Sequence, residues 1–219
     1  MPIRIPAALT LDDPAPAAEV LRSYFGDPYP GTAYTGAVFD SWDSTGTRDA
    51  DADVFTADDF IAIRFLSVDA GPVATRQILR DRRDEFSALL QAIGPDRDLA
   101  DEPGPIDNSW PAWALENHLR GVRGIGLTIA TKLIARKRPR LYPIWDTVVV
   151  DVLGTRGAHL VPIHAALRDG PDLRRRTHAA RESAGLPAHI SDLRILDTIA
   201  WMQGVSDGQR PGSSTESPA

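Results

Sequence analysis

The sequence has no cysteine and no long hydrophobic run among its 219 residues. Without thiols the chain cannot form disulfides, and it cannot hold an iron–sulfur cluster or a thiolate zinc site. Its apolar runs fall short of the roughly 18 residues that a membrane-spanning helix needs. The first residues also lack the basic and apolar segments of a signal peptide. We therefore expect a cytoplasmic protein without a metal, a cofactor or a membrane contact.

Acidic residues are missing from one internal stretch. Between Asn117 and Trp145 there is no aspartate or glutamate, although the whole chain has a net charge of −6. A protein that coats nucleic acid would be basic overall, so one basic strip in an acidic chain indicates a localised anionic partner. An ordinary solvated helix end is the alternative, since cations are favoured near helix C-termini. The cations of the strip are Arg120, Arg123, Lys132, Arg136, Lys137, Arg138 and Arg140.

Hydrophobic spacing and capping signals predict an all-α fold. The apolar run from Phe60 to Val68 also fits a strand, and the charged cluster from Arg80 to Glu85 indicates a break or an exposed turn within a helix. Ser109 is the expected cap of the helix that follows it. We expect one helical domain over residues 1–203 and a disordered tail over 204–219, which is rich in Ser, Gly and Pro. The predicted helices cover residues 15–25, 56–68, 72–93, 147–153, 162–167, 171–183 and 191–202, with two more inside 110–137.

The segment from Tyr34 to Trp42 reads YTGAVFDSW and is richer in aromatic residues than a free linker. One interpretation is a loop that places Phe39 and Trp42 in the core. The other is a loop that lines a pocket. The alternating acids of residues 49–53 lack the glycine and the glutamate of a calcium-binding loop, so we expect them to be solvated.

A glycine hairpin, Gly124-Ile125-Gly126, separates the two helices expected within 110–137. Glycines leave the backbone N–H groups at the start of the second helix uncovered, and the positive end of the helix dipole adds to them. Such a site accepts a phosphate oxygen. The residues expected to pack the two helices together are Leu119, Val122, Ile125, Ala130, Leu133 and Ile134.

This string resembles the helix-hairpin-helix motif of DNA-binding proteins, and the resemblance extends to the helix-hairpin-helix (HhH-GPD) DNA glycosylase superfamily. There, a Pro-apolar-Asp segment follows the hairpin, and its aspartate caps the next helix and takes part in catalysis. Pro143-Ile144-Trp145-Asp146-Thr147 stands at this place, with Asp146 twenty residues after Gly126. The resemblance implies a two-lobed helical bundle in which Asp146 borders the cleft. It also implies that Asp146 stabilises an oxocarbenium-like sugar or positions water.

The same resemblance implies roles in catalysis and DNA binding for other residues. Thr128 occupies the position of the lysine found in members with lyase activity, which implies a monofunctional enzyme without a Schiff base. DNA is the implied partner, and a flipped nucleotide would enter a pocket lined by Trp42, Trp110, Trp113 or Trp145. The implied contacts to the phosphate backbone are Arg123, Gly124, Gly126, Thr128, Lys132, Arg136, Lys137 and Arg138.

Two alternatives to this interpretation stay open. Asp146 fits a plain helix cap with no chemistry, which contributes about 1 kcal/mol. The whole chain also fits a non-catalytic helical module that binds a protein or a small anionic ligand. Over its full length the sequence is similar to an uncharacterised actinobacterial family with the segments YTGAxFD, GVRGIG and ARKRPRLYPIWD, a likeness that implies no function.

Overall fold

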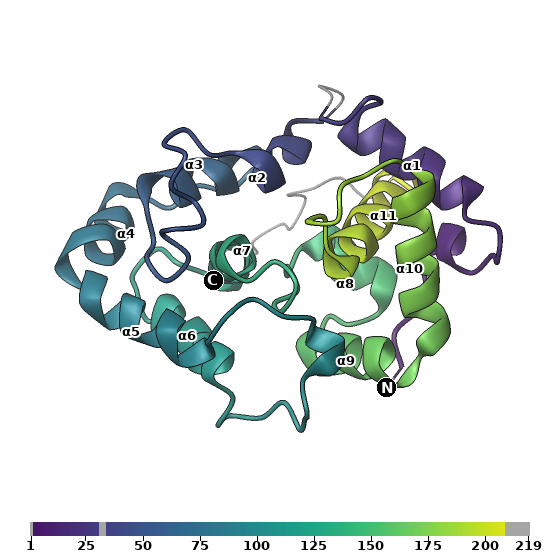
Figure 1. Ribbon diagram of the computed structural model, residues 1–219. Coiled ribbons are helices and arrows are strands. Elements are labelled where there is room, and N and C mark those ends of the chain that lie inside the picture. The colour runs from purple at the N-terminus through teal and green to yellow at the C-terminus, as the bar shows by residue number, and fades with distance from the viewer. Residues whose placement is uncertain (1, 31–33, 209–219) are drawn as a thin grey trace.

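The computed structural model describes residues 2–30 and 34–208, and this part of the chain is built from helices without a strand (Figure 1). The expected all-α class is therefore confirmed. In the described residues no helix has the length and apolar character to cross a membrane. The α-helices are α1 (Ala15–Phe25), α2 (Val38–Ser41), α3 (Ala57–Phe65), α4 (Pro72–Arg76), α5 (Arg83–Ile93), α6 (Pro111–Arg120), α7 (Leu127–Lys137), α8 (Thr147–Leu153), α9 (Leu160–Asp169), α10 (Pro171–Ser183) and α11 (Asp192–Ser206).

Local signals in the sequence explain most of the helix starts. Thr56 and Asp59 form a capping box at α3, with Thr56 N–H donating to Asp59 Oδ2 at 2.8 Å. The run after Thr56 is thus helical, and the strand alternative is wrong. The break expected within 72–93 is also present, because a π-helical turn (Gln77–Asp81) separates α4 from α5. Short 3₁₀ turns cover Ala7–Leu9, Thr35–Ala37 and Leu99–Asp101.

Two predicted helix ends differ from the structure. The hydroxyl of Ser109 donates to Asp107 Oδ1 at 2.6 Å, and Trp110 stands at the N-cap of α6 instead. Pro111 then starts the helix without needing an N–H bond. The last helix continues to Ser206, so the expected boundary at 204 falls too early. The remainder of the expected tail, residues 209–219, lies outside the described residues.

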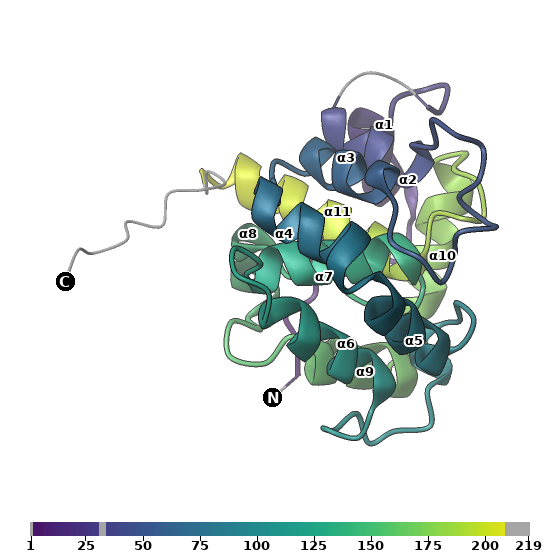
Figure 2. The ribbon, with the colours of Figure 1, turned by 90° about the vertical axis from the view of Figure 1, so that its left-hand side faces the viewer.

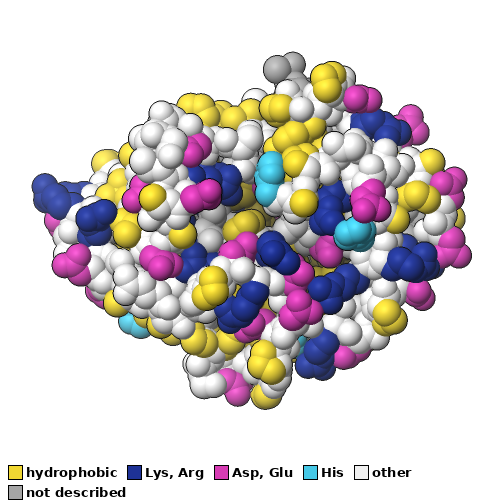
Figure 3. Space-filling view, in the orientation of Figure 1, with side chains coloured by type: hydrophobic (Ala, Val, Ile, Leu, Met, Phe, Trp, Pro, Cys, Tyr) yellow, Lys and Arg dark blue, Asp and Glu magenta, His cyan; other side chains and the backbone are white. Residues whose placement is uncertain are grey.

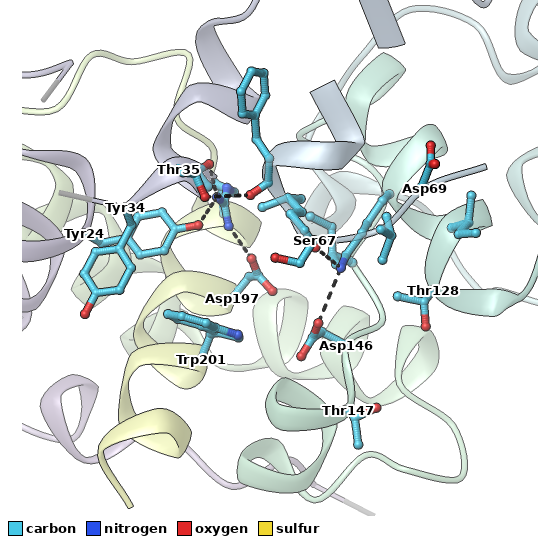
Figure 4. Close-up of a pocket in the computed structure, with 18 of the residues that line it drawn as sticks. Tyr24, Tyr34, Thr35, Ser67, Asp69, Thr128, Asp146, Thr147, Asp197 and Trp201 are labelled. Carbon is cyan, nitrogen blue, oxygen red and sulfur yellow. Dashed lines mark hydrogen bonds and ion pairs between the residues drawn. The ribbon is translucent and has the colours of Figure 1, made fainter. Parts of the chain in front are cut away.

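Helix α7 occupies the middle of the molecule in both ribbon views (Figures 1 and 2). It packs against α3 on one side and α6 on another, and every residue from Ala130 to Lys137 is buried. Helix α11 packs on α8, α1 and α10. This arrangement brings the start of α7, the start of α8 and the middle of α11 around one cavity (Figure 4).

Candidate functional site

The cavity has a volume of about 550 Å³ and is bordered by residues that are far apart in the sequence (Figure 4). The segments Tyr34–Gly36 and Phe65–Asp69 form one side. The starts of α7 and α8 form another, and α1 and α11 complete the wall. A volume of this size lies within the range of roughly 300–1,000 Å³ that is typical of small-molecule sites.

Three aromatic rings line one end of the pocket. The rings of Tyr24 and Tyr34 are stacked, with centroids 5.4 Å apart and planes 10° from parallel. Trp201 meets both edge-on, at 6.0 Å from Tyr24 and 5.8 Å from Tyr34. Such a group presents flat apolar faces and ring edges to a planar ligand. Tyr34 belongs to the YTGAVFDSW segment, so part of that segment lines the pocket, whereas Phe39 is buried in the core as the other interpretation expected.

Asp146 both caps α8 and faces the pocket. Its Oδ1 accepts a hydrogen bond from the N–H of Val148 at 3.0 Å, as an N-cap does. Its Oδ2 is 3.4 Å from Nζ of Lys132, and 19% of the side chain is exposed. Because Gly126 and Thr128 border the same cavity, the carboxylate opens toward the hairpin and is not enclosed against its own helix.

Lys132 lies within the pocket wall and not on the outside of the hairpin. Its side chain is 4% exposed, and Nζ donates to the carbonyl oxygen of Leu66 at 3.0 Å in addition to its contact with Asp146. Burial lowers the pKa of Lys132, while the nearby carboxylates of Asp146 and Asp197 act in the opposite direction. This amine is therefore placed to pair with Asp146 and not with an external phosphate.

Asp197 supplies a second carboxylate, which sequence reasoning missed. Arg194, one turn earlier on α11, donates from Nη1 to Asp197 Oδ2 and from Nε to Asp40 Oδ2 at 2.8 Å. The guanidinium is further held by the hydroxyl of Tyr24 and the carbonyl of Gly36. Burial raises the pKa of Asp197 to about 6, and the charge of Asp146 acts in the same direction, whereas Arg194 and Lys132 oppose it.

Ser67 is a further pocket residue without a sequence signal. Its φ of 60° makes it the one non-glycine residue with positive φ in the described part of the chain. Non-glycine residues in this conformation are uncommon, and they gather at functional sites. The preceding carbonyl, that of Leu66, is the one bound by Lys132, so the turn after α3 is tied directly to α7.

The glycine hairpin joins α6 to α7 at the edge of the pocket. The N–H of Ile125 bonds the carbonyl of Val122 at 3.0 Å, and Gly124 has a φ of +92°. Arg123, Gly124 and Gly126 are exposed, and Gly126 is the N-cap of α7. The N–H groups of the first turn of α7 have no carbonyl four residues earlier within the helix. The apolar residues expected to pack the two helices are all buried.

Besides Lys132, three more cations expected on a DNA-binding surface are buried instead. Arg136 donates to the carbonyl of Phe39 at 2.7 Å, Lys137 pairs with Asp59 at 2.7 Å, and Arg138 binds the carbonyls of Gly94, Ala52 and Leu90 as well as Asp53. Buried charges require such partners. These side chains therefore hold the acidic loop before α3 against α7, which excludes Arg136, Lys137 and Arg138 as phosphate contacts.

The surface around this cluster does not form a basic strip. Arg140 lies outside the core but pairs with Asp98 at 2.9 Å, and Arg120 pairs with Glu116. Positive and negative side chains are interspersed over the face shown in Figure 3. Of the expected backbone contacts, Arg123, Gly124, Gly126 and Thr128 are positioned at the hairpin, and Lys132 lies inside the pocket.

None of the four tryptophans expected in the pocket lines it. Trp110 is buried, stacks on Tyr142 and donates to Glu102 at 2.7 Å. Trp42 donates to Asp58 at 3.1 Å and packs on Phe65. Trp113 packs against the core, and Trp145 has its backbone N–H bonded to Thr131. The aromatic wall instead combines Tyr24, Tyr34 and Trp201, which only the packing of α1 and α11 brings together.

Fold and site thus define an all-helical protein with an aromatic, carboxylate-bearing pocket beside a glycine hairpin. Residues 17–204 match a family of unknown function, DUF6308, and the chain belongs to that family. The matched range contains every residue of the pocket. The comparison with curated proteins and the comparison with solved structures found no match.

Proposed function

We propose that the protein interacts with DNA as a monofunctional glycosylase-like enzyme of the helix-hairpin-helix kind, and that Asp146 assists cleavage of an N-glycosidic bond in the pocket. The observation that carries the proposal is the position of Asp146. Its carboxylate faces a cavity with an aromatic wall, and Gly126 and Thr128 of the hairpin border the same cavity. The sequence motif and the pocket therefore both single out the carboxylate of Asp146 as the candidate catalytic group.

The pocket suits a nucleotide taken out of the base stack. Enzymes that act on a base within a duplex extrude it into a pocket and hold it between aromatic or apolar side chains. Tyr34 is exposed and stacked on buried Tyr24, so its outer face is available to a base. Trp201 closes one side of the aromatic wall. The sugar would then lie toward α8, where Asp146 and Thr147 border the cavity.

Asp146 is held ready to stabilise positive charge. As the bond from the sugar to the base lengthens, the sugar becomes cation-like, and a fixed carboxylate in a sheltered site lowers the energy of that state. The N–H of Val148 and the ammonium of Lys132 hold the two oxygens of Asp146 in place before the reaction. Water adds to the sugar carbon, the electron pair of the broken bond stays on the base, and a proton from water is released.

The hairpin supplies the expected contact with DNA. Arg123 is exposed, and Gly126, the N-cap of α7, borders the pocket. The N–H groups of the first turn of α7 have no partner within the helix and are the expected phosphate donors. Because Arg136, Lys137 and Arg138 are buried, we expect only about two phosphates to be contacted. Log affinity should then fall with log salt concentration with a slope of roughly −2.

The first test is base release from duplexes that carry damaged or mismatched bases, with Asp146→Asn as the variant. Asparagine still accepts the N–H of Val148, so the helix cap and DNA binding should persist, while release should fall about 100-fold or more. Asp172→Asn is a matched control, because Asp172 lies on α10 and is exposed. Within the described residues its one ion pair is with Arg175. Equal rates for Asp146→Asn and wild type would remove Asp146 from the mechanism.

A second candidate function is a non-catalytic module that binds a small anionic ligand. The burial of four cations of the basic strip favours it, because little positive surface remains for a long polyanion. Calorimetry would separate the two functions. Binding of a mononucleotide together with no binding of duplex DNA at low salt would replace the DNA-directed proposal with this one.

A further inference from the structure

Among the described residues, the pocket has two carboxylates to which the proposed reaction gives no role, Asp69 and Asp197. Asp69 is exposed and lies near Arg64, whereas Asp197 is sheltered. Asp197 projects from the middle of α11 toward the cavity that Asp146 faces from the start of α8 (Figure 4). Its side chain is 13% exposed, so it is sheltered but still in contact with the cavity. The two carboxylates thus border one cavity from different helices.

The two oxygens of Asp197 have different surroundings. Oδ2 accepts a hydrogen bond from Arg194, whose guanidinium is also bound by Asp40, Tyr24 and Gly36. Among the described residues Oδ1 has no hydrogen-bond partner, although the residue lines the cavity. Arg194 therefore fixes the orientation of the carboxyl group and leaves Oδ1 for a ligand.

The charged and titratable groups around Asp197 come from four other elements. Lys132 of α7 and Asp146 at the start of α8 face it across the pocket, while Tyr24 of α1 and Asp40 of α2 reach it through Arg194. Burial dominates this balance and raises the pKa of Asp197 to about 6. A fraction of Asp197 is therefore a neutral acid near neutral pH, unlike an ordinary surface aspartate.

We propose that Asp197 is the general acid of the reaction, donating the proton on Oδ1 to a ring nitrogen of the departing base. This inference rests on the proposed function. The C1′–N bond breaks and its electron pair goes to the base, which takes the proton from Asp197. Water adds to C1′ beside Asp146, and the proton it loses returns to the Asp197 carboxylate. The sum is hydrolysis, and the substrate class is a nucleotide whose base leaves as an uncharged, protonated product.

The test compares two leaving groups in Asp197→Asn. One set of duplexes carries neutral bases, such as hypoxanthine, uracil and mismatched adenine. The other carries 7-methylguanine, whose fixed positive charge lets it leave without receiving a proton. A general acid contributes about 10²- to 10⁴-fold. We therefore expect release of neutral bases to fall at least 100-fold in the variant and release of 7-methylguanine to change less than about 3-fold.

Two more measurements test the role of Asp197 even if Asp197→Asn folds poorly. In wild type, release of a neutral base should decline as pH rises above about 6, because the acid loses its proton, whereas release of 7-methylguanine should lack this limb. Asp197→Glu, which keeps the acid, should restore part of the activity. Melting curves would show whether asparagine, which can still accept from Arg194, preserves the fold.

The possible failures are distinguishable. Suppose that wild type releases bases but Asp197→Asn lowers the release rates of neutral bases and of 7-methylguanine equally, or lowers neither rate. Asp197 is then not the acid, and the proposed function stands. If wild type released 7-methylguanine but no neutral base, the inference would also be overturned, because no substrate would then require a proton from Asp197. If wild type releases no base from any duplex, the proposed function fails, and with it the role of Asp197. Asp146→Asn should lower the release rates of both kinds of base, because Asp146 acts on the sugar.

Discussion

The two halves of α7 use buried cations in different ways. Near its C-terminal end, Arg136, Lys137 and Arg138 are surrounded by carbonyls and acids from segments distant in the sequence. One turn before Arg136, Lys132 is equally buried but borders a cavity that Asp146 and Asp197 also line. In this protein, a buried charged residue is a candidate for function where it borders a pocket that also holds a polar atom without a hydrogen-bond partner. The first cluster holds the fold together, and the second is available for chemistry.

The strongest test of this comparison is the removal of a cation from the structural cluster. Arg138→Met leaves the carbonyls of Gly94, Ala52 and Leu90 without their donor, together with the carboxylate of Asp53. Asp53 is 45% exposed, so water can replace the lost donor there, but leaving the carbonyls without a donor costs about 1–3 kcal/mol each and about 3–5 kcal/mol together. We expect a loss of this size in the free energy of unfolding, measured with urea.

The neighbouring Arg140→Met is the control for Arg138→Met. Arg140 is 48% exposed and pairs with Asp98 at the surface. Such pairs contribute about 0–1 kcal/mol. If both variants lost the same stability, the burial of Arg138 would carry no special energetic role, and the division of α7 into two halves would fail.

In the pocket, we expect a smaller effect, which is a dependence of the free energy of unfolding on pH through Asp197. The pKa of Asp197 is raised from 3.8 to about 6 in the folded protein. Between these values the folded state binds a proton that the unfolded state has released, so stability is greatest at low pH and falls as pH rises from about 4 to 6. The expected change is on the order of 3 kcal/mol.

Urea unfolding at a series of pH values checks this, with Asp197→Asn as the variant. Asparagine does not titrate, so the decline from about pH 4 to 6 should flatten in the variant. The decline should persist in Asp172→Asn, since Asp172 lies on the surface. An unchanged slope in Asp197→Asn would show that Asp197 is charged throughout and would weaken its proposed role as an acid.

The smallest expected effect concerns the hairpin backbone beside the pocket. Gly124 has a φ of +92°, and a Cβ there would meet nothing within 4 Å, so Gly124→Ala introduces backbone strain without a clash. We expect a stability loss of about 1 kcal/mol. Gly157→Ala is a control, because that glycine also has open space and no positive φ. Equal melting temperatures for the two variants would contradict a conformational need for glycine at Gly124.

Much of the fold could be predicted because the signals for it are local. The capping box at Thr56, the prolines that open α4, α6 and α10, and the glycine that ends α8 each act within a few residues. Asp146 as the cap of α8 follows from the same kind of signal. The packing residues of the hairpin were predictable too, since helical spacing alone places them on facing sides.

The pocket and the fate of the basic strip could not be predicted in this way. Arg138 meets Asp53 across 85 positions of sequence, and Arg194 meets Tyr24 across 170. Whether a cation is solvated or buried depends on which carbonyls and acids the packing brings to it, and no local pattern records that. The resemblance to glycosylases implies that tryptophans line a pocket, yet large aromatic rings equally suit the core, which holds Trp110.

The sequence by itself determined the helices, the glycine hairpin and the carboxylate at the start of α8, because capping and helical periodicity operate over one or two turns. Only the tertiary structure decided that Asp146 faces Lys132, Asp197 and the aromatic wall around one cavity. It also decided that the basic strip is mostly a buried support for α7. The reason is physical: a side chain's accessibility and pKa are set by its neighbours in space, and these come from all along the chain.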